Sequence, residues 1–231
     1  MNTRFLLLWF EAPLQSWGAD SKFGRRDSLP FPTKSGVLGL ICAALGASGE
    51  QTELLAEMAP LKQTVISYRN RADRQPLLRD FHMVGSGYDS SDPWQSLLIP
   101  KTSAGKPAVG GGTKMTYRYY LQDAKFAVVV EAPAEKADIF AGALQAPVYD
   151  IFLGRKNCAP TDFVYRDIFG TEAEAITAAA AIAVEKELAE DFRVVSGENT
   201  EGESAIINDV PLQFGPIKKY KDRRVTVIQH G

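Results

Sequence analysis

A continuous apolar run near the start of the chain, residues 4–11, most constrains the fold. It reads Arg-Phe-Leu-Leu-Leu-Trp-Phe-Glu, so apolar side chains fall on both alternating faces between two charged ends. A strand of this composition is stable only when both of its faces are covered. The sequence therefore predicts a central strand with a layer of structure on each side. Ala12-Pro13 ends it, because proline cannot donate a hydrogen bond to a neighbouring strand.

A polar segment, residues 14–36, follows this run and leads directly into an apolar helix. Ser35 is the expected N-cap and Gly46 the expected residue after the helix, in line with the preferences of serine and glycine at helix ends. The start of such a helix offers unpaired N–H groups to an anion such as a phosphate. Gly36 and Gly39 weaken this helix, which we expect where a neighbouring element packs closely. Its apolar face recurs with a period of 3.6 residues at Val37, Leu40, Ile41, Ala44 and Leu45.

Further strands and helices follow in a regular order. β-branched and aromatic residues predict strands at 63–69, 117–121, 125–131 and 148–153. Helices are predicted at 51–58 and at 134–145, the second with Ile139, Phe140, Ala143 and Leu144 on its buried face. The order strand, helix, strand, insertion, strand, helix, strand is the βαββαβ order of α+β, ferredoxin-like domains, which include RNA-recognition modules.

The insertion between the second and third strands, residues 70–118, is too long for a passive connection. It lacks periodicity up to about residue 115 and carries a basic excess, several prolines and aromatic residues. Either a disordered loop or an arm that orders on a partner is compatible with this composition. Because both ends lead into strands, a projecting β-hairpin thumb is favoured. The arm residues that we expect to meet a partner are Arg71, Arg79, Phe81, His82 and Trp94.

The remaining chain, residues 156–231, predicts a smaller C-terminal subdomain rich in β-structure, after a ferredoxin-like, RNA-binding domain at 1–155. Its alanine- and glutamate-rich segment 171–188 is predicted to be a helix capped by Thr171. Strands are predicted at 192–197, 205–210 and 223–229, with a basic cluster at 218–224.

The charge distribution allows a basic face on a chain whose formal net charge is only −2. Lys and Arg predominate in the arm and at the C-terminal end, whereas Asp and Glu predominate between residues 132 and 204. Two cysteines form neither a disulfide framework nor a metal-ligand pattern, so no cofactor or metal is expected. No stretch is long enough to span a membrane, and we expect a cytoplasmic protein without a membrane partner.

Six short motifs, in this order, resemble type I-E members of CRISPR-associated protein family five, in the RAMP superfamily. They are Leu-Gln-Ser-Trp-Gly at 14–18, Phe-Pro-Thr-Lys-Ser-Gly-Val-Leu-Gly-Leu at 31–40, Asp-Phe-His at 80–82, Tyr-Tyr-Leu-Gln-Asp-Ala-Lys-Phe at 119–126, Leu-Gly-Arg-Lys-Asn-Cys at 153–158, and the tail at 220–225. The resemblance implies antiviral defense as a non-catalytic subunit of the Cascade surveillance complex that caps the 5′ handle of CRISPR RNA. It further implies that the thumb meets the adjacent backbone subunit. The large subunit that reads the protospacer-adjacent motif would be another partner, so a free-standing homo-oligomer is not expected.

An RNA strand needs phosphate donors and stacking surfaces, and several residues offer them. Lys34, Ser35 and Gly36 are expected to bind phosphate, Gln15 to read a base edge and Trp17 to stack. Trp17 is equally well explained as a core aromatic, and basic residues are commonly solvated surface groups. The other expected RNA contacts are Arg25, Arg26, Lys114, Arg118, Arg155 and Lys156, with the cluster at 218–224 placed second.

The alternative function is a metal-independent CRISPR-repeat endoribonuclease like the type I-C equivalent, which the chain also resembles. Such cleavage needs a general base, a general acid and a cation at the phosphate. The chain has two histidines, His82 in the arm and His230 at the end, and Lys114 is followed by Met115 rather than histidine. We therefore expect no enzyme activity. A metal-dependent nuclease and an isolated RNA-recognition module are weaker alternatives.

Overall fold

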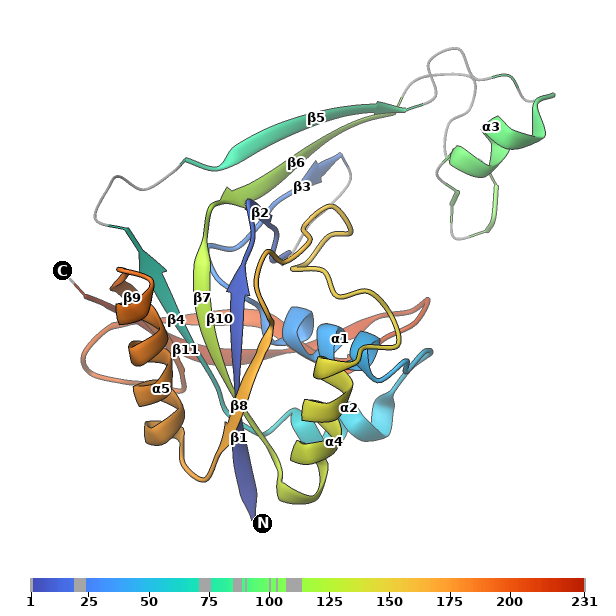
Figure 1. Cartoon of the computed structure of the whole chain (residues 1–231). Helices are drawn as coiled ribbons and strands as arrows, with labels where there is room; N and C mark the ends of the chain where they lie inside the picture. Colours follow the sequence, from blue (N-terminus) through green and yellow to red (C-terminus); the bar gives the residue numbers. More distant parts are fainter. Residues whose placement is uncertain are drawn as a thin grey trace.

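The computed structural model describes residues 2–18, 24–70, 76–84, 89, 91–99, 101–102, 104–106 and 114–230. It is a mixed α+β structure with antiparallel sheets (Figure 1). In chain order, its elements are β1 Thr3–Glu11, β2 Leu14–Gln15, β3 Arg25–Arg26, α1 Lys34–Ala44, α2 Thr52–Met58, β4 Gln63–Arg69, β5 Leu78–Val84, α3 Pro93–Leu98, β6 Lys114–Gln122, β7 Lys125–Pro133, α4 Ala134–Gln145, β8 Tyr165–Phe169, α5 Glu172–Glu185, β9 Ala189–Ser196, β10 Glu203–Gln213 and β11 Lys219–Gln229.

The main sheet has seven strands in the order β10-β11-β9-β4-β7-β1-β8. β1 lies inside this sheet, antiparallel to β7 on one side and to β8 on the other. Residues Leu6 to Phe10 are fully buried, and their alternation divides them between two cores. Leu6, Leu8 and Phe10 pack with α1 and α4, whereas Leu7 and Trp9 pack with α5. The predicted interior strand with two covered faces is confirmed.

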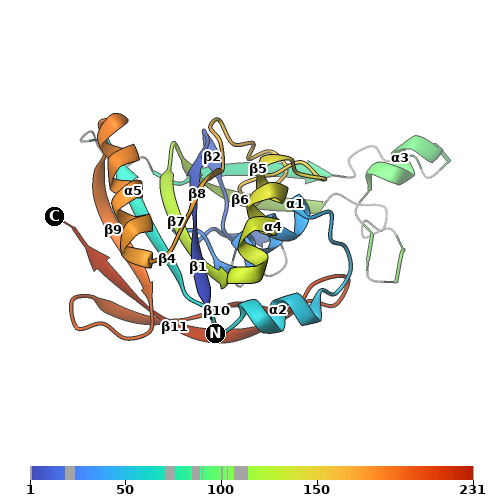
Figure 2. The ribbon, with the colours of Figure 1, turned by 60° about the horizontal axis from the view of Figure 1, so that its bottom comes forward.

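Helices on the two faces of the sheet explain this burial (Figures 1 and 2). α4 buries Phe140 and Leu144 against the larger core. On the other face α5 packs through a row of alanines, Ala175, Ala179 and Ala183, which lets the helix lie close to the strands. α5 begins at the predicted cap: Thr171 and Glu174 form a reciprocal capping box.

The N-cap of α1 lies two residues earlier in the chain than the sequence suggests. Its N-cap is Thr33, whose hydroxyl accepts a hydrogen bond from Gly36 N at 3.1 Å, so the predicted cap at Ser35 is wrong. Both threonine and serine suit this position, and the apolar spacing does not separate them. The predicted Gly46 at the helix end is confirmed, with a φ of +70°.

Two predictions are wrong, one for the segment after α4 and one for a side chain of α4 itself. Residues 148–153 form no strand; the strand that pairs with β1 is β8, at Tyr165–Phe169. Ile139 is exposed rather than buried, because Ala137 and Ala141 share the inner face of α4 with Phe140 and Leu144. An apolar side chain at the margin of a helix face does not reveal by itself on which side it lies.

The C-terminal strands extend the sheet that the N-terminal strands begin. β9 pairs with β4, and the long β10–β11 hairpin continues from β9 and passes beside α2 (Figure 2). Val225 and Phe192 belong to the same core as β1. Strands from both sides of the predicted boundary at 155/156 thus belong to one continuous sheet. A separately folding C-terminal unit stays a prediction.

The predicted hairpin arm is confirmed by β5 and β6, which pair antiparallel from Leu78 opposite Tyr120 to Val84 opposite Lys114. β6 continues into the body, where it also pairs with β2 and with β3. Figure 1 shows the hairpin projecting from the body with α3 at its far end. Arg71, one of the expected arm contacts, lies outside the described residues.

The contact between α1 and Trp17 gives a stability prediction. A Cβ at Gly36 would lie 2.8 Å from the Trp17 ring, while a Cβ at Gly39 would lie 3.9 Å from its nearest neighbour, Phe214. We expect Gly36→Ala to destabilise the protein by about 1–3 kcal/mol because of overpacking. Gly39→Ala is the matched control and should be neutral or stabilising by up to about 1 kcal/mol, since alanine favours the helix.

Urea denaturation of both variants, followed by circular dichroism, measures this difference. Equal stability of the two variants would contradict a close Trp17 contact.

Candidate nucleic-acid interface

A cleft of about 720 Å³ runs along α1 and is the candidate site. Its floor consists of small residues of this helix, including Gly36, Gly39 and Ala43. Segments from five other parts of the chain form its walls: residues 16–18, 26–27, 47–51, 149–155 and the β10–β11 connection. Its basic side chains are Arg26, Arg155 and Lys218; its acidic ones are Asp27 and Asp150; and its aromatic ones are Trp17, Tyr149, Phe152, Phe214 and Tyr220.

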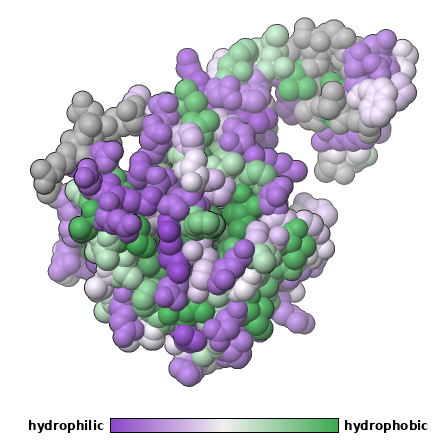
Figure 3. Space-filling view, viewed as in Figure 1, coloured by the Kyte–Doolittle hydropathy of each residue, from purple (hydrophilic) through white to green (hydrophobic). Residues whose placement is uncertain are grey.

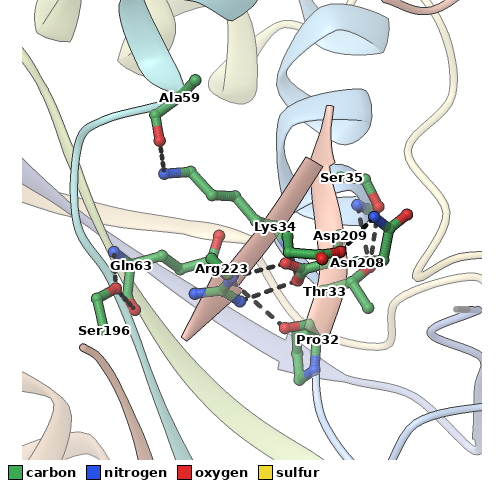
Figure 4. Close-up of polar contacts among 12 residues, drawn as sticks. Pro32, Thr33, Lys34, Ser35, Ala59, Gln63, Ser196, Asn208, Asp209 and Arg223 are labelled. Atoms are coloured by element: carbon green, nitrogen blue, oxygen red, sulfur yellow. Dashed lines mark hydrogen bonds and ion pairs between the residues drawn. The ribbon is translucent and has the colours of Figure 1, made fainter. Parts of the chain in front are cut away.

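An internal carboxylate occupies part of the N-terminal end of α1. Asp209 of β10 accepts a hydrogen bond from Lys34 N at 2.7 Å and is 1% exposed (Figure 4). Arg223 of β11 binds the same carboxylate through Nε at 2.7 Å and Nη2 at 2.9 Å. The anion expected at this helix start is therefore provided in part by the protein itself.

The expected phosphate contact of Lys34 does not fit this geometry. Its side chain runs away from the cleft, and its ammonium donates hydrogen bonds to the carbonyl oxygens of Ala59, at 2.8 Å, and of Leu61 (Figure 4). Burial lowers the pKa of Lys34 to about 8, with nearby Arg223 adding to the shift and Asp209 opposing it. Lys34 joins α1 to the end of α2 and is not available to a ligand in the cleft.

Gln15 and Trp17 do not take their expected roles either. Gln15 is fully buried; its amide donates to Ala124 O at 2.6 Å and to Phe10 O at 3.3 Å, and its oxygen accepts from Trp17 Nε1 at 3.1 Å. Trp17 is buried and stacks on Phe10 with 5.3 Å between ring centroids. Their polar groups are used inside the core, so the alternative reading of Trp17 as a core aromatic is the correct one.

Arg155 forms the junction between the cleft and the arm. Its guanidinium donates to Arg26 O at 2.8 Å and to Tyr119 O at 3.2 Å and lies 4.7 Å from the centroid of the Tyr120 ring. The preceding Gly154 has a φ of +102°, and a Cβ there would lie only 1.8 Å from Ser16 O. Only glycine allows the two backbones to approach this closely. The segment is thereby held against residues 16–18, and Arg155 is directed toward the arm.

The structure brings four of the expected RNA-binding residues, Arg26, Ser35, Gly36 and Arg155, together around one cleft. Other expected RNA-binding residues lie outside it. Arg25 binds Asp27 at 2.7 Å and lies over the Tyr119 ring, and Lys156 is exposed next to the cleft wall. Lys114 and Arg118 lie on β6 in the arm.

Several residues that line the cleft were missed by sequence reasoning. Tyr149 and Asp150 lie in a segment that was predicted to be a strand, and Phe214 had no signal at all. Lys218 and Tyr220 belong to the tail, whose basic cluster gave the one available signal. Their positions depend on how β10 and β11 return to α1, which a local pattern does not reveal.

The expected partner-binding residues of the arm fall on its two faces. Arg79 and Phe81 share a face with Tyr117; the Phe81 and Tyr117 rings lie 5.3 Å apart. His82 pairs with Asp80 on the other face. Trp94 of α3 is 78% exposed. Figure 3 shows hydrophilic and hydrophobic side chains on this arm.

Comparison with known proteins identifies the family of the chain. The model of a family described as CRISPR-associated protein (Cas_Cas5) matches residues 5–226. The chain belongs to this family. A Cas5-family protein of Escherichia coli (strain K12), the CRISPR system Cascade subunit CasD, is 28% identical over 169 residues, which make up 68% of this chain and 67% of CasD.

Two solved structures resemble the whole of this Cas5-family protein. One is a chain of a CRISPR RNA-guided surveillance complex, with 30% identity and a TM-score of 0.71, covering 97% of this chain and 89% of that one. The other is described as a Cas protein, with 22% identity, a TM-score of 0.55 and 98% coverage of both chains. The second shares the fold only.

Two further findings concern metal-binding side chains and membrane-spanning helices among the described residues of this Cas5-family protein. Within them, no cluster of three or more His, Cys, Asp or Glu side chains could hold a metal ion. Among the helices that the structure describes, none is long and apolar enough to cross a membrane.

The Asp209 contact predicts a large loss of stability on substitution. Asp209→Asn should destabilise the protein by about 3–5 kcal/mol, because the nearly buried Arg223 loses its ion-pair partner. Asp222→Asn is the matched control on β11: Asp222 is exposed and pairs with Asn208 at the surface, so we expect less than about 1 kcal/mol. Thermal and urea denaturation measure both changes. Similar losses in the two variants would contradict the role assigned to Asp209.

Proposed function

We propose that this protein is a non-catalytic subunit of a type I-E Cascade complex that binds and caps the 5′ handle of CRISPR RNA in the cleft along α1. The observation that carries the proposal is the cleft itself, which combines three basic side chains and four aromatic ones that are not buried, Tyr149, Phe152, Phe214 and Tyr220, over a floor of small residues. Single-stranded RNA is bound by this combination of phosphate-binding cations and stacking surfaces. The similarity to CasD and to a surveillance-complex chain supports the same assignment.

The sheet order supports a ferredoxin-like domain as the frame of this site. The strands β4-β7-β1-β8 are neighbours, and they alternate in the chain with α1 and α4 in the βαββαβ order. β8 as the fourth strand extends this domain to residue 169, past the boundary expected at residue 155. The division into this domain and a C-terminal subdomain is part of the proposal.

The cations that we assign to the RNA are Arg26, Arg155 and Lys218. Lys218 is exposed, and no ion pair of the described residues involves it, so its charge is available to a phosphate. Arg155 donates to two carbonyl oxygens, which fix the plane of its guanidinium, and it lines the cleft at the junction with the arm. These residues confer affinity, which is independent of sequence.

The polar face of the arm continues from this cleft. Paired residues on adjacent strands share a face, so Asp80 and Arg118 lie on the same side as His82 and Thr116. Arg26 of β3 is also paired with Arg118 and lines the cleft, so it connects the two surfaces. We assign Lys114 and Arg118 to the RNA as it leaves the cleft.

The opposite face of the arm is aromatic and methionine-rich, with Phe81, Met83, Met115 and Tyr117 all exposed. Adaptable methionine side chains and aromatic rings are typical of protein interfaces. We assign this face to the adjacent backbone subunit of Cascade. We assign the end of the arm, which carries Trp94, to a neighbouring subunit as well. The large subunit that reads the protospacer-adjacent motif is the other proposed partner.

The absence of RNA cleavage is also a proposal. His230 lies 3.2 Å from Glu190 and does not line the cleft, and His82 is held by Asp80 in the arm. One observation favours the metal-independent endoribonuclease as an alternative: the His82–Asp80 pair lies opposite Arg118, so an imidazole and a cation share one face of the arm.

RNA binding at different salt concentrations tests the proposed function. We expect Arg26→Ala and Lys218→Ala each to weaken the binding of single-stranded CRISPR repeat RNA. Each should also reduce the slope of the logarithm of the binding constant against the logarithm of salt concentration by the contribution of about one phosphate contact. Lys136→Ala is the control, because Lys136 pairs with Glu57 outside the cleft. Fluorescence anisotropy in EDTA at several salt concentrations gives the slopes.

Unchanged slopes in both cleft variants would contradict the assignment of the cleft to RNA. Denaturing gels of the same samples show whether the repeat RNA is intact. A specific cut that His82→Ala abolishes would favour the endoribonuclease.

The arm prediction concerns assembly. A double variant, Met83→Ser and Met115→Ser, changes a cross-strand pair whose two side chains are both 57% exposed. We expect it to reduce co-purification with the other Cascade subunits at least about tenfold, since a central apolar contact is worth about 2 kcal/mol or more. RNA binding by the isolated protein should be unchanged.

Ile139→Ser with Val184→Ser is the matched control, because these side chains are at least as exposed, at 59% and 76%, but lie on α4 and α5. Normal assembly of the arm variant would mean that this face does not hold a subunit.

A further inference from the structure

The two ends of the cleft differ in chemistry. α1 has eleven residues and is therefore about 16 Å long. Its N-terminal end meets Arg26, Ser35 and Arg155, which suit a phosphate. At its C-terminal end the cleft is lined by Gln51, Tyr149 and Asp150, none of which is a cation, although the β10–β11 connection that also lines the cleft carries Lys218.

Backbone hydrogen bonds hold this second end together. Tyr149 N donates to Ala43 O of α1 at 3.2 Å, which places the segment after α4 at the end of α1. Phe214 N donates to Glu50 O at 2.9 Å, which brings the β10–β11 connection to the same place. Three segments that are far apart in the sequence are thus fixed around one end of the cleft.

The polar groups at this end are hydrogen-bond acceptors. Within the described chain, no ion pair or hydrogen bond engages the Asp150 side chain, so its carboxylate is free to accept. Gln51 donates one amide N–H to Ser48 O at 2.5 Å, and its oxygen can accept a hydrogen bond. The C-terminal end of a helix also carries partial negative charge. This end therefore disfavours a phosphate and favours a neutral group that carries N–H donors.

Aromatic surface at the same end suits a flat ligand. Tyr149 is 54% exposed and lines the cleft, so part of its side chain is accessible to a ligand. Phe214 lies over the helix floor, where a Cβ at Gly39 would be 3.9 Å from its ring. An unpaired base combines a flat ring with N–H donors on its edge, and aromatic side chains stack on bases of any sequence.

We propose that the C-terminal end of the cleft is a nucleobase subsite, in which one base stacks on Tyr149 and donates a hydrogen bond from its amino group to Asp150. This inference rests on the proposed binding of RNA in the cleft. Adenine, cytosine and guanine carry an amino group, whereas uracil places the O4 acceptor where cytosine has its N4 amino group. The carboxylate repels this oxygen. Asp150 is thus a specificity-determining residue that disfavours uracil relative to cytosine at one position of the handle.

The test compares cytosine with uracil, because these bases differ in the amino group but match in size. The probes are 3′-labelled RNAs of eight adenosines in which each position in turn is replaced by cytidine or by uridine. Dissociation constants are measured at one salt concentration for the full-length wild type and for Asp150→Asn. We expect wild-type protein to prefer cytidine at least about fivefold at one position. Asp150→Asn should reduce this preference below about twofold there, since an amide can donate to O4 as well as accept.

Two control variants separate the charge from the site. Asp138→Asn makes the same change on α4, at an exposed residue outside the cleft, and should keep the wild-type preference. Tyr149→Leu should weaken the binding of the cytidine and uridine probes equally, at least about fivefold, because only stacking is lost. A melting curve for each variant confirms that it is folded.

The outcomes distinguish the subsite from the proposed function. Tight RNA binding with no position that distinguishes cytidine from uridine, or with an unchanged preference in Asp150→Asn, would overturn the subsite and leave the cleft function intact. RNA binding that depends on neither Arg26 nor Lys218 would overturn the proposed function and the subsite together.

Discussion

The contact of Asp209 with the start of α1 determines how the two ends of the chain meet. The carboxylate comes from β10, near the C-terminus, and it binds a backbone N–H of the first helix and the guanidinium of Arg223. This one carboxylate compensates both the partial positive charge at the start of the helix and the charge of the nearly buried arginine. Because β10 is fixed there, the hairpin that follows brings Phe214, Lys218 and Tyr220 over the helix. The cleft exists only because the last strands return to the first helix.

The same contact explains why the cleft is polarised. A helix start that was fully open would attract phosphate directly, but Asp209 and the cap Thr33 already use two of its N–H groups, those of Lys34 and Gly36. In the proposed function, the attraction for RNA at this end comes from Arg26 and Arg155, which also line the cleft. At the other end of the helix the partial charge is negative, and the lining residues are acceptors and aromatic rings. The proposed function and the proposed subsite together thus place a phosphate at the start of α1 and a base at its end.

Much of the fold was predictable, because it depends on local patterns. The apolar run at 4–11, the spacing of α1, the capping box of α5 and the strong β7 pattern all report burial or local hydrogen bonding directly. β8 was missed because its residues are only partly buried and their pattern is weak, whereas the loop at 148–153 contains residues with high strand propensity. The strand pairing of β9 with β4 is a contact between distant parts of the chain, which no local pattern encodes.

The candidate site was predicted less well, and Gln15, Trp17 and Lys34 show why. Each has a side chain suited to RNA, and each lies in a segment next to the cleft, but the direction of the side chain decides its role. Gln15 and Lys34 instead satisfy buried carbonyl groups, a demand that every compact fold creates and that polar side chains near a loop commonly meet. Residue type near a ligand-binding loop thus predicts the location of a site better than it predicts which residues bind. The residues left free to bind are those whose polar atoms the fold does not need, and Asp150 and Lys218 meet this condition within the described chain.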